Sequence, residues 1–305
     1  MKKGALQLFD RLNYRRYLRE ILKRRPDALV CTHFLAYLSI SEELRARGAQ
    51  IPVFAVTTDF DAHQYWVDPV VMRYYVHTRE SAWQLHAKGV PAERIRVAGI
   101  PVAAAFSKPL LRQTARRRLE LPPRSFTVLI LAGGAGVGRV EEVVGHVASV
   151  LQHSERRPFS VAVVCGTNAG LKERLERFPF PPNVHARILG FVNNMDEWMG
   201  AADVLVSKAG GLTSAEAMAR GLPMIVIDPI PGQETRNTDI IVENGAGWKA
   251  LNLGNLMYKL MRVLERPERL RQARRATRQL AQPAAAATII ADVLKYLRKN
   301  PRKET

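Results

Sequence analysis

Short apolar runs alternate with helical patterns through the second half of this chain, and this alternation most constrains the fold. The runs are rich in Val, Ile, Leu and Phe, which is typical of buried strands, and they lie at residues 126–132, 160–165, 184–189, 203–207 and 223–227. Helical spacing separates them, for example at residues 141–152, 171–178 and 213–220. Strand–helix alternation predicts βαβ units and an α/β fold, with a parallel sheet covered by helices on both faces.

The first half shows the same rhythm less completely. Strands are expected at residues 28–31, 52–57, 73–76 and 94–98, and helices at residues 36–47 and 80–88. The chain has 305 residues, which is enough for two domains. We expect an N-terminal domain over residues 1–110, a basic linker over 111–123, a second domain over 124–282, and a C-terminal helix over 283–305 that crosses back to the first domain.

The charge is strongly basic, with 46 Lys and Arg against 28 Asp and Glu and a formal net charge of +18. Such a balance favours an anionic partner, namely nucleic acid, a membrane surface or a phosphorylated ligand, or else a solvated basic surface. Residues 2–25 mix basic and apolar side chains, which suits a helix lying on anionic lipid, or a helix packed on the first domain. Aromatic residues are only 7% of the chain and no RNA-binding motif occurs, so we expect no nucleic-acid partner.

The sequence shows no apolar leader and no run of about 18 apolar residues. We therefore expect a cytoplasmic protein that is peripheral on the inner face of the cell membrane. Cys31 and Cys165 each end an apolar run, which predicts buried, reduced thiols in strands rather than a disulfide.

A glycine-rich loop, which begins with Gly133 and Gly134, follows the first strand of the second domain. Glycine lets a backbone approach a ligand closely, and the helix start that follows favours an anion. The loop lacks the Lys-Ser/Thr ending of a P-loop, and no acidic residue ends the next strand, as a dinucleotide site would require. A simple tight turn is the alternative.

A second glycine turn, at Gly210 and Gly211, leads into a helix that we expect Thr213 and Ser214 to cap. Free N–H groups at a helix start, together with the helix dipole, suit a diphosphate. Glu216, within about the first turn, suits the two hydroxyls of a ribose. The alternative is that Thr213 and Glu216 only form a capping box.

Two more loops are expected at the same carboxyl edge of the sheet. Gln233 and Glu234 open a helix after a Pro- and Gly-containing loop, and an amide and a carboxylate can bind sugar hydroxyls. Phe191 can pack on a flat base that meets the backbone of residues 191–195. Ordinary turn chemistry explains each loop alone, but their number at one edge favours a nucleotide-sugar site.

These motifs resemble those of the diacylglycerol glycosyltransferases, which include the processive bacterial glucosyltransferases and the plant monogalactosyldiacylglycerol synthases. The resemblance rests on residues 208–217, Gly221-Leu-Pro223, Pro231-Gly-Gln-Glu234 and Asn237 in the second half. In the first half it rests on Pro26-Asp27, Thr32-His33 and Thr58-Asp59-Phe60, with His63, Trp66, residues 89–90 and residues 99–102 matching in order.

The resemblance implies a GT-B fold, with two Rossmann-like domains facing across a cleft. It implies an inverting transfer of a hexose from UDP-glucose or UDP-galactose to diacylglycerol or glycosyl-diacylglycerol. The acceptor would be bound by His63 and Trp66. The donor would be bound by Gly133, Gly134, Phe191, Val192, Met195, Lys208, Gly210, Gly211, Leu212, Thr213, Ser214, Glu216, Gln233, Glu234 and Asn237. The alternative within this class is another lipid acceptor, such as a peptidoglycan precursor.

The implied displacement needs a base for the acceptor proton and positive potential for the leaving diphosphate. Asp59, His33 and His63 are the candidate bases, with Asp59 and His33 preferred, although Asp59 can instead cap a turn and His33 can be a structural turn residue. The helix start and Lys208 can stabilise the diphosphate, so we expect neither a metal nor a cofactor. The Asp59-Phe-Asp61 pair lies in the wrong half of the chain to hold a donor metal.

The family begins with a strand and a Gly-rich loop that ends in histidine, and residues 1–6 match neither. A βαβ unit takes about 30 residues, so we expect the first domain to be incomplete. The rival from a different class is therefore a catalytically incomplete protein that binds nucleotide sugar or membrane without turnover.

Overall fold

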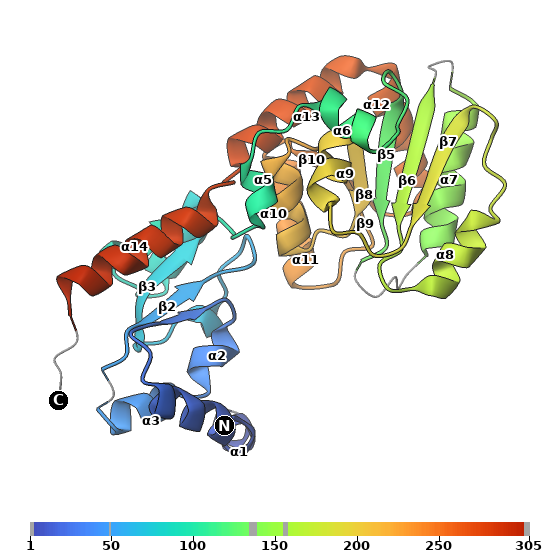
Figure 1. The fold of residues 1–305 in the computed structure, drawn as a ribbon. Helices are drawn as coiled ribbons and strands as arrows, with labels where there is room; N and C mark the ends of the chain where they lie inside the picture. Colours follow the sequence, from blue (N-terminus) through green and yellow to red (C-terminus); the bar gives the residue numbers. More distant parts are fainter. Residues whose placement is uncertain (1–2, 49, 134–138, 155–157, 302–305) are drawn as a thin grey trace. The chain divides into compact units, whose positions relative to one another are not determined.

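The computed structural model describes residues 3–48, 50–133, 139–154 and 158–301 (Figure 1). The chain divides into two compact units: unit 1 comprises Met1–Pro101 and Ala284–Thr305, and unit 2 comprises Val102–Pro283. Each unit contains its own sheet of parallel strands flanked by helices. The predicted α/β fold class is confirmed.

Unit 1 is built on a four-stranded sheet in the order β1-β2-β3-β4. Its strands are β1 (Leu29–Cys31), β2 (Val53–Val56), β3 (Val71–Val76) and β4 (Ile95–Val97). All neighbours pair in parallel, and all four lie where the apolar runs predicted them. The single helix expected at residues 36–47 is instead two short helices, α2 (Phe34–Leu38) and α3 (Ser41–Ala46), because the backbone leaves the helical region at Ile40.

Two long helices belong to unit 1, α1 (Lys3–Arg24) and α14 (Ala285–Lys299). The end of α1 packs on the core through buried Ile21 and the half-buried Tyr17, Leu18 and Leu22. Its sequence does not separate polar from apolar residues onto two faces. α14 covers the other face of the sheet, where Ile289 and Val293 join a separate apolar cluster with strand residues. The remaining elements are η1 (Gln64–Trp66), α4 (Arg79–Ala87) and η2 (Ala92–Arg94).

Within the ranges that the structure describes, no helix has an apolar stretch long enough to cross a bilayer.

Unit 2 is built on a six-stranded parallel sheet in the order β10-β9-β8-β5-β6-β7. The strands are β5 (Phe126–Leu131), β6 (Phe159–Val164), β7 (Val184–Leu189), β8 (Val204–Ser207), β9 (Met224–Ile227) and β10 (Gly247–Ala250). Read from β7, this is the 3-2-1-4-5-6 order of dinucleotide-binding Rossmann folds. The strand order therefore reverses between β5 and β8, and ligands of such sheets bind beyond the carboxyl ends of the strands at that point.

Helices cover both faces of the unit 2 sheet (Figure 1). α7 (Val140–Gln152), α8 (Ala169–Glu176) and α12 (Leu253–Glu265) share one large apolar cluster with alternate residues of the strands. α6 (Arg112–Arg118), α9 (Met195–Ala201) and α10 (Gly211–Ala219) contact one another on the other side. The unit also contains α5 (Ala104–Ser107), α11 (Gln233–Glu243) and α13 (Pro267–Leu280).

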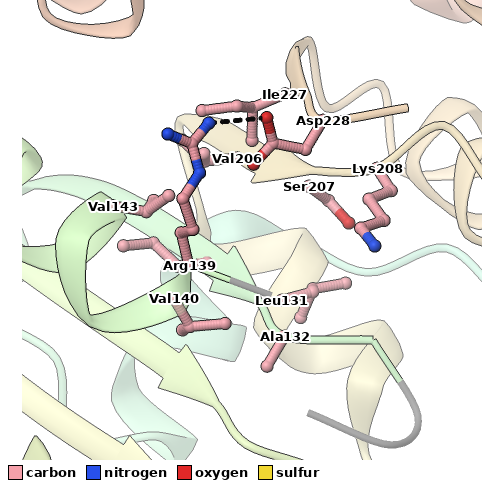
Figure 2. Close-up of a pocket in the computed structure, with 11 residues that line it drawn as sticks. Leu131, Ala132, Arg139, Val140, Val143, Val206, Ser207, Lys208, Ile227 and Asp228 are labelled. Carbon is pink, nitrogen blue, oxygen red and sulfur yellow. Dashed lines mark hydrogen bonds and ion pairs between the residues drawn. The ribbon is translucent and has the colours of Figure 1, made fainter. Parts of the chain in front are cut away.

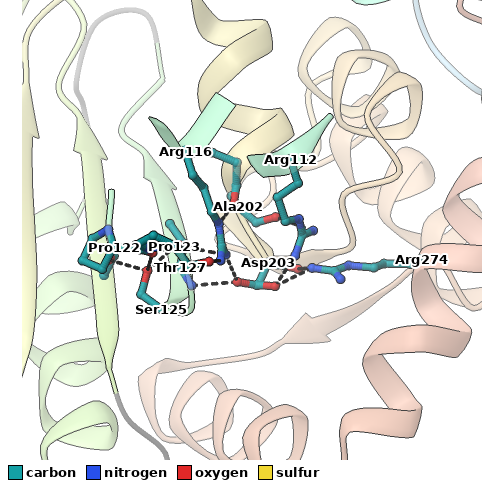
Figure 3. Close-up of polar contacts among 11 residues, drawn as sticks. Arg112, Arg116, Pro122, Pro123, Ser125, Thr127, Ala202, Asp203 and Arg274 are labelled. Atoms are coloured by element: carbon teal, nitrogen blue, oxygen red, sulfur yellow. Dashed lines mark hydrogen bonds and ion pairs between the residues drawn. The ribbon is translucent and has the colours of Figure 1, made fainter. Parts of the chain in front are cut away.

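The segment 111–123, which the sequence suggested as a linker, contains α6 and lies within unit 2. Its anchor is Asp203, directly before β8 (Figure 3). Arg112 contacts Asp203 Oδ1 at 2.5 Å, Arg116 contacts Oδ2 at 2.8 Å, and Arg274 of α13 contacts Oδ1 at 2.6 Å. The backbone N–H of Thr127 also donates to Oδ2 at 2.8 Å.

Asp203 is 6% exposed, and burial by itself raises the pKa of a carboxyl group. The charges of Arg112 and Arg274, the Thr127 N–H and the charge of Arg116 outweigh burial and hold the pKa of Asp203 below its usual range. The carboxylate thus joins α6, α13 and the beginnings of β5 and β8.

Replacing Asp203 with Asn leaves three buried or half-buried arginines without their anion. We expect Asp203→Asn to lower the free energy of unfolding by about 3–5 kcal/mol, the usual cost of breaking a buried ion pair. Because the native pKa is depressed, the contribution of Asp203 is present above about pH 4 and is lost as the pH falls through the native pKa. Urea unfolding of both proteins at pH 7 and pH 3 measures the difference, which should shrink at pH 3. An unchanged stability at pH 7 would show that the network is dispensable.

Candidate functional site

A small cavity opens at the carboxyl edge of the unit 2 sheet, at the point where the strand order reverses (Figure 2). Its volume is about 40 Å³, which holds a few water molecules but no nucleotide. The ends of β5, β8 and β9 and the start of α7 line it, through Ile130, Leu131, Ala132, Arg139, Val140, Val143, Val206, Ser207, Lys208, Ile227 and Asp228. A ligand as large as a nucleotide would therefore lie over this cavity, against the loops around it.

An ion pair links two loops around the cavity, between Arg139 Nη2 and Asp228 Oδ1 at 2.9 Å (Figure 2). Asp228 follows β9 with a positive φ of 46°, which is rare for a residue other than glycine. Sequence reasoning missed this pair. The only signal was that each residue follows a loop or strand end at the same edge of the sheet.

The first turn of α10 is open toward this edge. Gly210 is its N-cap, with extended backbone and no side-chain cap, and Ser214 N–H donates to Gly210 O at 2.9 Å. The N–H groups of Gly211, Leu212 and Thr213 therefore have no carbonyl partner within the helix. The expectation that Thr213 and Ser214 cap the helix was wrong, because the helix already begins at Gly211.

The capping-box alternative fails for the same reason, since Thr213 lies inside the helix rather than before it. The hydroxyl of Ser214 is fully buried and has no hydrogen-bond partner among the residues that the structure describes. The start of α10 thus holds unsatisfied donors that a side-chain cap would have consumed.

Glu216 lies one turn further along α10 and is half-buried. In the described ranges its carboxylate forms neither a hydrogen bond nor an ion pair, and burial raises its pKa to about 7. Lys208, which lines the cavity, also has no acidic partner in those ranges. An unpaired carboxylate and an unpaired ammonium group therefore lie near the same helix start.

Polar contacts at both ends hold α10 in place. Asn237 Nδ2 donates to Ala209 O at 2.9 Å, so this fully buried residue, predicted to bind the donor, holds the loop before α10. At the far end, Arg220 forms an ion pair with Asp196 at 2.9 Å and donates to Lys108 O at 2.8 Å. The helix is therefore fixed at both ends.

The loop between β9 and α11 lies beside α10. Glu234 Oε2 accepts from the Ile230 N–H at 2.6 Å, and Glu234 Oε1 lies 3.9 Å from where a Cβ of residue 210 would be. Gly232, the N-cap of α11, has a φ of 99°, a conformation that favours glycine. Gln233 is exposed. The structure thus brings Glu234 next to Gly210, as the two motifs suggested.

The other predicted donor residues lie on neighbouring loops of the same edge. Phe191 is 72% exposed after β7, and Val192 and Met195 are half-buried. Gly133 follows β5 with a φ of 74°. Gly134 lies outside the described residues.

In unit 1, the candidate bases follow β1 and β2, which are adjacent parallel strands. Asp59 is half-buried in the loop after β2. His33 Nδ1 accepts from the Leu35 N–H at 3.2 Å and so caps α2. One ring nitrogen of His33 is therefore committed to a structural contact.

Aromatic rings gather beside these loops. Phe34 lies 4.4 Å from His33, 4.9 Å from His63 and 5.8 Å from Tyr65, measured between ring centroids. Of the two predicted acceptor residues, His63 belongs to this group, whereas Trp66 is only 1% exposed and lies in the core. Tyr65, which is 61% exposed, offers the accessible ring instead.

Two family models match most of the chain. Residues 3–102 match the monogalactosyldiacylglycerol (MGDG) synthase family, and residues 127–292 match the glycosyltransferase family 28 C-terminal domain. The second match alone covers more than half of the chain.

Individual relatives agree. The chain is 33% identical over 227 residues to a processive diacylglycerol beta-glucosyltransferase of Staphylococcus carnosus, covering 74% of this chain and 56% of the relative. It is 33% identical over 292 residues to a probable monogalactosyldiacylglycerol synthase 2 of Oryza sativa subsp. indica. This match covers 93% of this chain and 62% of the relative. A processive diacylglycerol beta-glucosyltransferase of Bacillus cytotoxicus is 31% identical over 271 residues. This match covers 88% of this chain and 68% of the relative. The chain thus spans little more than half the length of some relatives.

Solved structures share the fold at lower identity. Acinetobacter baumannii MurG superposes with a TM-score of 0.67 and 20% identity, covering 91% of this chain and 76% of MurG. The calicheamicin glycosyltransferase CalG4 gives a TM-score of 0.69 and 16% identity, and the match covers 98% of this chain and 84% of CalG4. These likenesses show a GT-B fold. Together with the family models and relatives, they establish that the chain belongs to the diacylglycerol glycosyltransferase family, with the MGDG synthases and the processive diacylglycerol glucosyltransferases.

Proposed function

We propose that this chain transfers a hexose from UDP-glucose or UDP-galactose to diacylglycerol or glycosyl-diacylglycerol, with inversion at the anomeric carbon. Relatives at 31–33% identity are named as diacylglycerol glucosyltransferases and an MGDG synthase, which supports the reaction class. The donor, the acceptor and the cellular location are the finer parts of the proposal.

The observation that carries the donor site is the unpaired, half-buried carboxylate of Glu216 beside the open start of α10. A buried charge without a partner is unfavourable in the free protein, and a bound ligand that hydrogen-bonds to the Glu216 carboxylate would remove this cost. The two hydroxyls of a ribose suit this role, since both can donate to one carboxylate. The N–H groups at the start of α10 and the Lys208 ammonium then suit the diphosphate.

The remaining donor contacts follow from the neighbouring loops. Gln233 and Glu234 would bind the hexose hydroxyls, and Phe191, Val192 and Met195 would border the uracil. Asn237 would act on the donor only through the loop that it holds, because its side chain is fully buried.

The transfer is a single displacement at the anomeric carbon. The acceptor hydroxyl oxygen forms a bond to that carbon, the bond from the carbon to the diphosphate oxygen breaks, and UDP leaves with the electron pair. The proton of the hydroxyl passes to a base, for which we propose Asp59. The α10 start and Lys208 stabilise the charge that develops on the diphosphate, and the mechanism requires no metal or cofactor.

The acceptor assignment rests on unit 1. Residues 3–102 match the MGDG synthase family model, which favours diacylglycerol over a peptidoglycan precursor. We propose that the exposed ring of Tyr65, with Phe34 and His63 behind it, contacts the acceptor. Trp66 supports this group from the core.

We further propose that the protein works in the cytoplasm, at the inner face of the membrane, where a diacylglycerol acceptor is available. The basic sequence of α1 suits an anionic membrane surface. The packing of Ile21 and its neighbours commits the end of α1 to the core of unit 1, so its exposed arginines would make that contact.

Replacing Glu216 with Gln tests the donor site directly. We expect Glu216→Gln to weaken binding of UDP-glucose and UDP-galactose by about tenfold to a hundredfold, because it removes a charged hydrogen-bond acceptor. Calorimetric titration measures this, with Glu243→Gln, an exposed glutamate at the end of α11, as the matched control. The melting temperature should not fall, since the change removes a half-buried unpaired charge. Equal affinities of the variant and the wild type would refute the ribose contact.

The raised pKa of Glu216 makes donor binding pH-dependent. Because the ribose needs the ionised form and the pKa is raised to about 7, affinity for UDP-hexose should fall about tenfold between pH 8 and pH 6. The donor's diphosphate stays ionised throughout this interval, so it adds no dependence of its own. Glu216→Gln should bind with the same affinity at both pH values. A wild-type affinity that does not change with pH would contradict the assignment.

Transfer itself tests the base. We expect Asp59→Asn to lower turnover by about a hundredfold to ten-thousandfold while leaving UDP-hexose affinity unchanged. His33→Gln should cost much less, because one ring nitrogen of His33 already caps α2. Labelled hexose transferred to diacylglycerol in detergent micelles is the readout. Donor binding by the wild type without any transfer would instead favour a protein that binds nucleotide sugar without turnover.

A further inference from the structure

A basic cavity of about 220 Å³ lies in unit 1, and none of the residues assigned above lines it. Arg73 of β3 and Arg96 of β4 line one side, and the end of α14 lines the other through Asp292, Lys295, Tyr296, Lys299 and Asn300. A water molecule needs only about 10–15 Å³ of such space, so the cavity admits an ion of several heavy atoms.

Among the described residues, one carboxylate lines this cavity, and it already has hydrogen-bond and ion-pair partners. Asp292 is 5% exposed, and its Oδ2 accepts from Arg73 at 2.5 Å and from the Tyr75 hydroxyl at 2.8 Å, while Oδ1 contacts Arg96 at 2.7 Å. Although burial opposes it, hydrogen bonds from Arg73 and Tyr75 and the charges of both arginines hold the pKa of Asp292 below its usual range. Asp292 is thus an ionised anchor that joins α14 to the sheet.

In the part of the chain that the structure describes, four cations line the cavity against this single anion, which leaves a formal charge of three positive units. Lys295 and Lys299 follow Asp292 by three and seven residues, so α14 places them on the same face as the anchor. Both are exposed, and neither has an acidic partner in the described part of the chain. Arg73 Nε is buried and, within the same ranges, has no hydrogen-bond acceptor.

These donors differ from an ordinary solvated surface. Asp292 holds the guanidinium groups of Arg73 and Arg96. The packing of Ile289 and Val293 on the sheet fixes the helix from which the two lysines extend. Arginine forks and lysine point charges around one cavity are the residues that recognise phosphate oxygens in proteins. A carboxylate ligand would use fewer of the donors than a tetrahedral oxyanion.

We propose that this cavity binds a phosphate group, either of a soluble phosphate ester or of an anionic lipid head group. Lys295 and Lys299 contact the phosphate oxygens, while Arg73 and Arg96 remain held by Asp292 and contribute their charge. The proposal involves only residues of unit 1, and its outcome is independent of whether unit 2 binds a UDP-sugar.

The test compares two double variants of the full chain. Lys295→Ala with Lys299→Ala removes the two lysines of the cavity. Arg79→Ala with Arg298→Ala removes two exposed charges of the same unit that do not line it. Neither pair touches Asp292, so the anchor of α14 stays intact in both variants. Calorimetric titration with inorganic phosphate, against sodium chloride of equal ionic strength, measures the site.

We expect the lysine variant to bind inorganic phosphate about twenty-five-fold more weakly than the wild type, because each lysine contributes about fivefold. The arginine variant should stay within about twofold. Absence of phosphate binding by the wild type at millimolar concentration, or equal losses in the two variants, would overturn the proposal, because the second result means general charge rather than a site.

Two further probes identify the source of the phosphate. If cosedimentation with phosphatidylcholine vesicles containing phosphatidylglycerol falls in the lysine variant alone, the cavity takes a lipid head group. If affinity for glycerol phosphate falls in that variant while cosedimentation does not change, the cavity takes a soluble ester. Each result supports the phosphate site and assigns its ligand. If the lysine variant loses neither cosedimentation nor affinity for glycerol phosphate, the proposed phosphate site is contradicted.

Discussion

The ion cluster at Asp203 is the constraint on which unit 2 depends. Asp203 precedes β8, and it accepts the backbone N–H of Thr127 at the beginning of β5 while it holds arginines from α6 and α13. β5 and β8 are the two strands between which the order of the sheet reverses. Because strands are stiff, fixing their beginnings also fixes the opposite edge, from which the loops of the candidate donor site emerge. A buried ion network is costly to desolvate. This network lies where it aligns β5 and β8, the two strands that border the candidate donor site.

The carboxylates of Asp203 and Glu216, both in unit 2, have opposite pKa shifts because their surroundings differ. Asp203 is buried with four partners, and its pKa is lowered. Glu216 is half-buried with none in the described chain, and burial raises its pKa to about 7. The signs for stability are opposite: ionisation of Asp203 favours the folded state, whereas ionisation of Glu216 above its usual pKa disfavours it. Within the described ranges the carboxylate of Glu216 has no internal partner, and this is the basis of the donor contact that we propose.

The sequence was sufficient for every strand of the two sheets except β10 and for the edge that bears the candidate site, because strand–helix alternation and the carboxyl-edge rule depend on local pattern alone. It was insufficient wherever a long-range contact decided the role of a residue. Asn237 was predicted to bind the donor, but its amide donates to Ala209 O, and Trp66 was predicted to bind the acceptor, but it is 1% exposed in the core of unit 1. α10 begins at Gly211 rather than after Thr213, because the open glycine start replaces a side-chain cap. The pair of Arg139 and Asp228 joins residues far apart in the chain, and no local pattern reports it.

The structure also explains part of the excess of basic residues. Three arginines surround Asp203 and two surround Asp292, so two buried aspartates account for five of the positive charges without any partner molecule. The planar guanidinium group makes several directed contacts at once, which suits such buried clusters. Among the described residues no lysine belongs to either cluster, whereas Lys208, Lys295 and Lys299 line cavities and have no acidic partner there. The flexible ammonium group is easily hydrated in the free protein and easily redirected to a phosphate. In these two clusters arginine therefore stabilises the fold, whereas Lys208, Lys295 and Lys299 have no such structural partner in the described ranges.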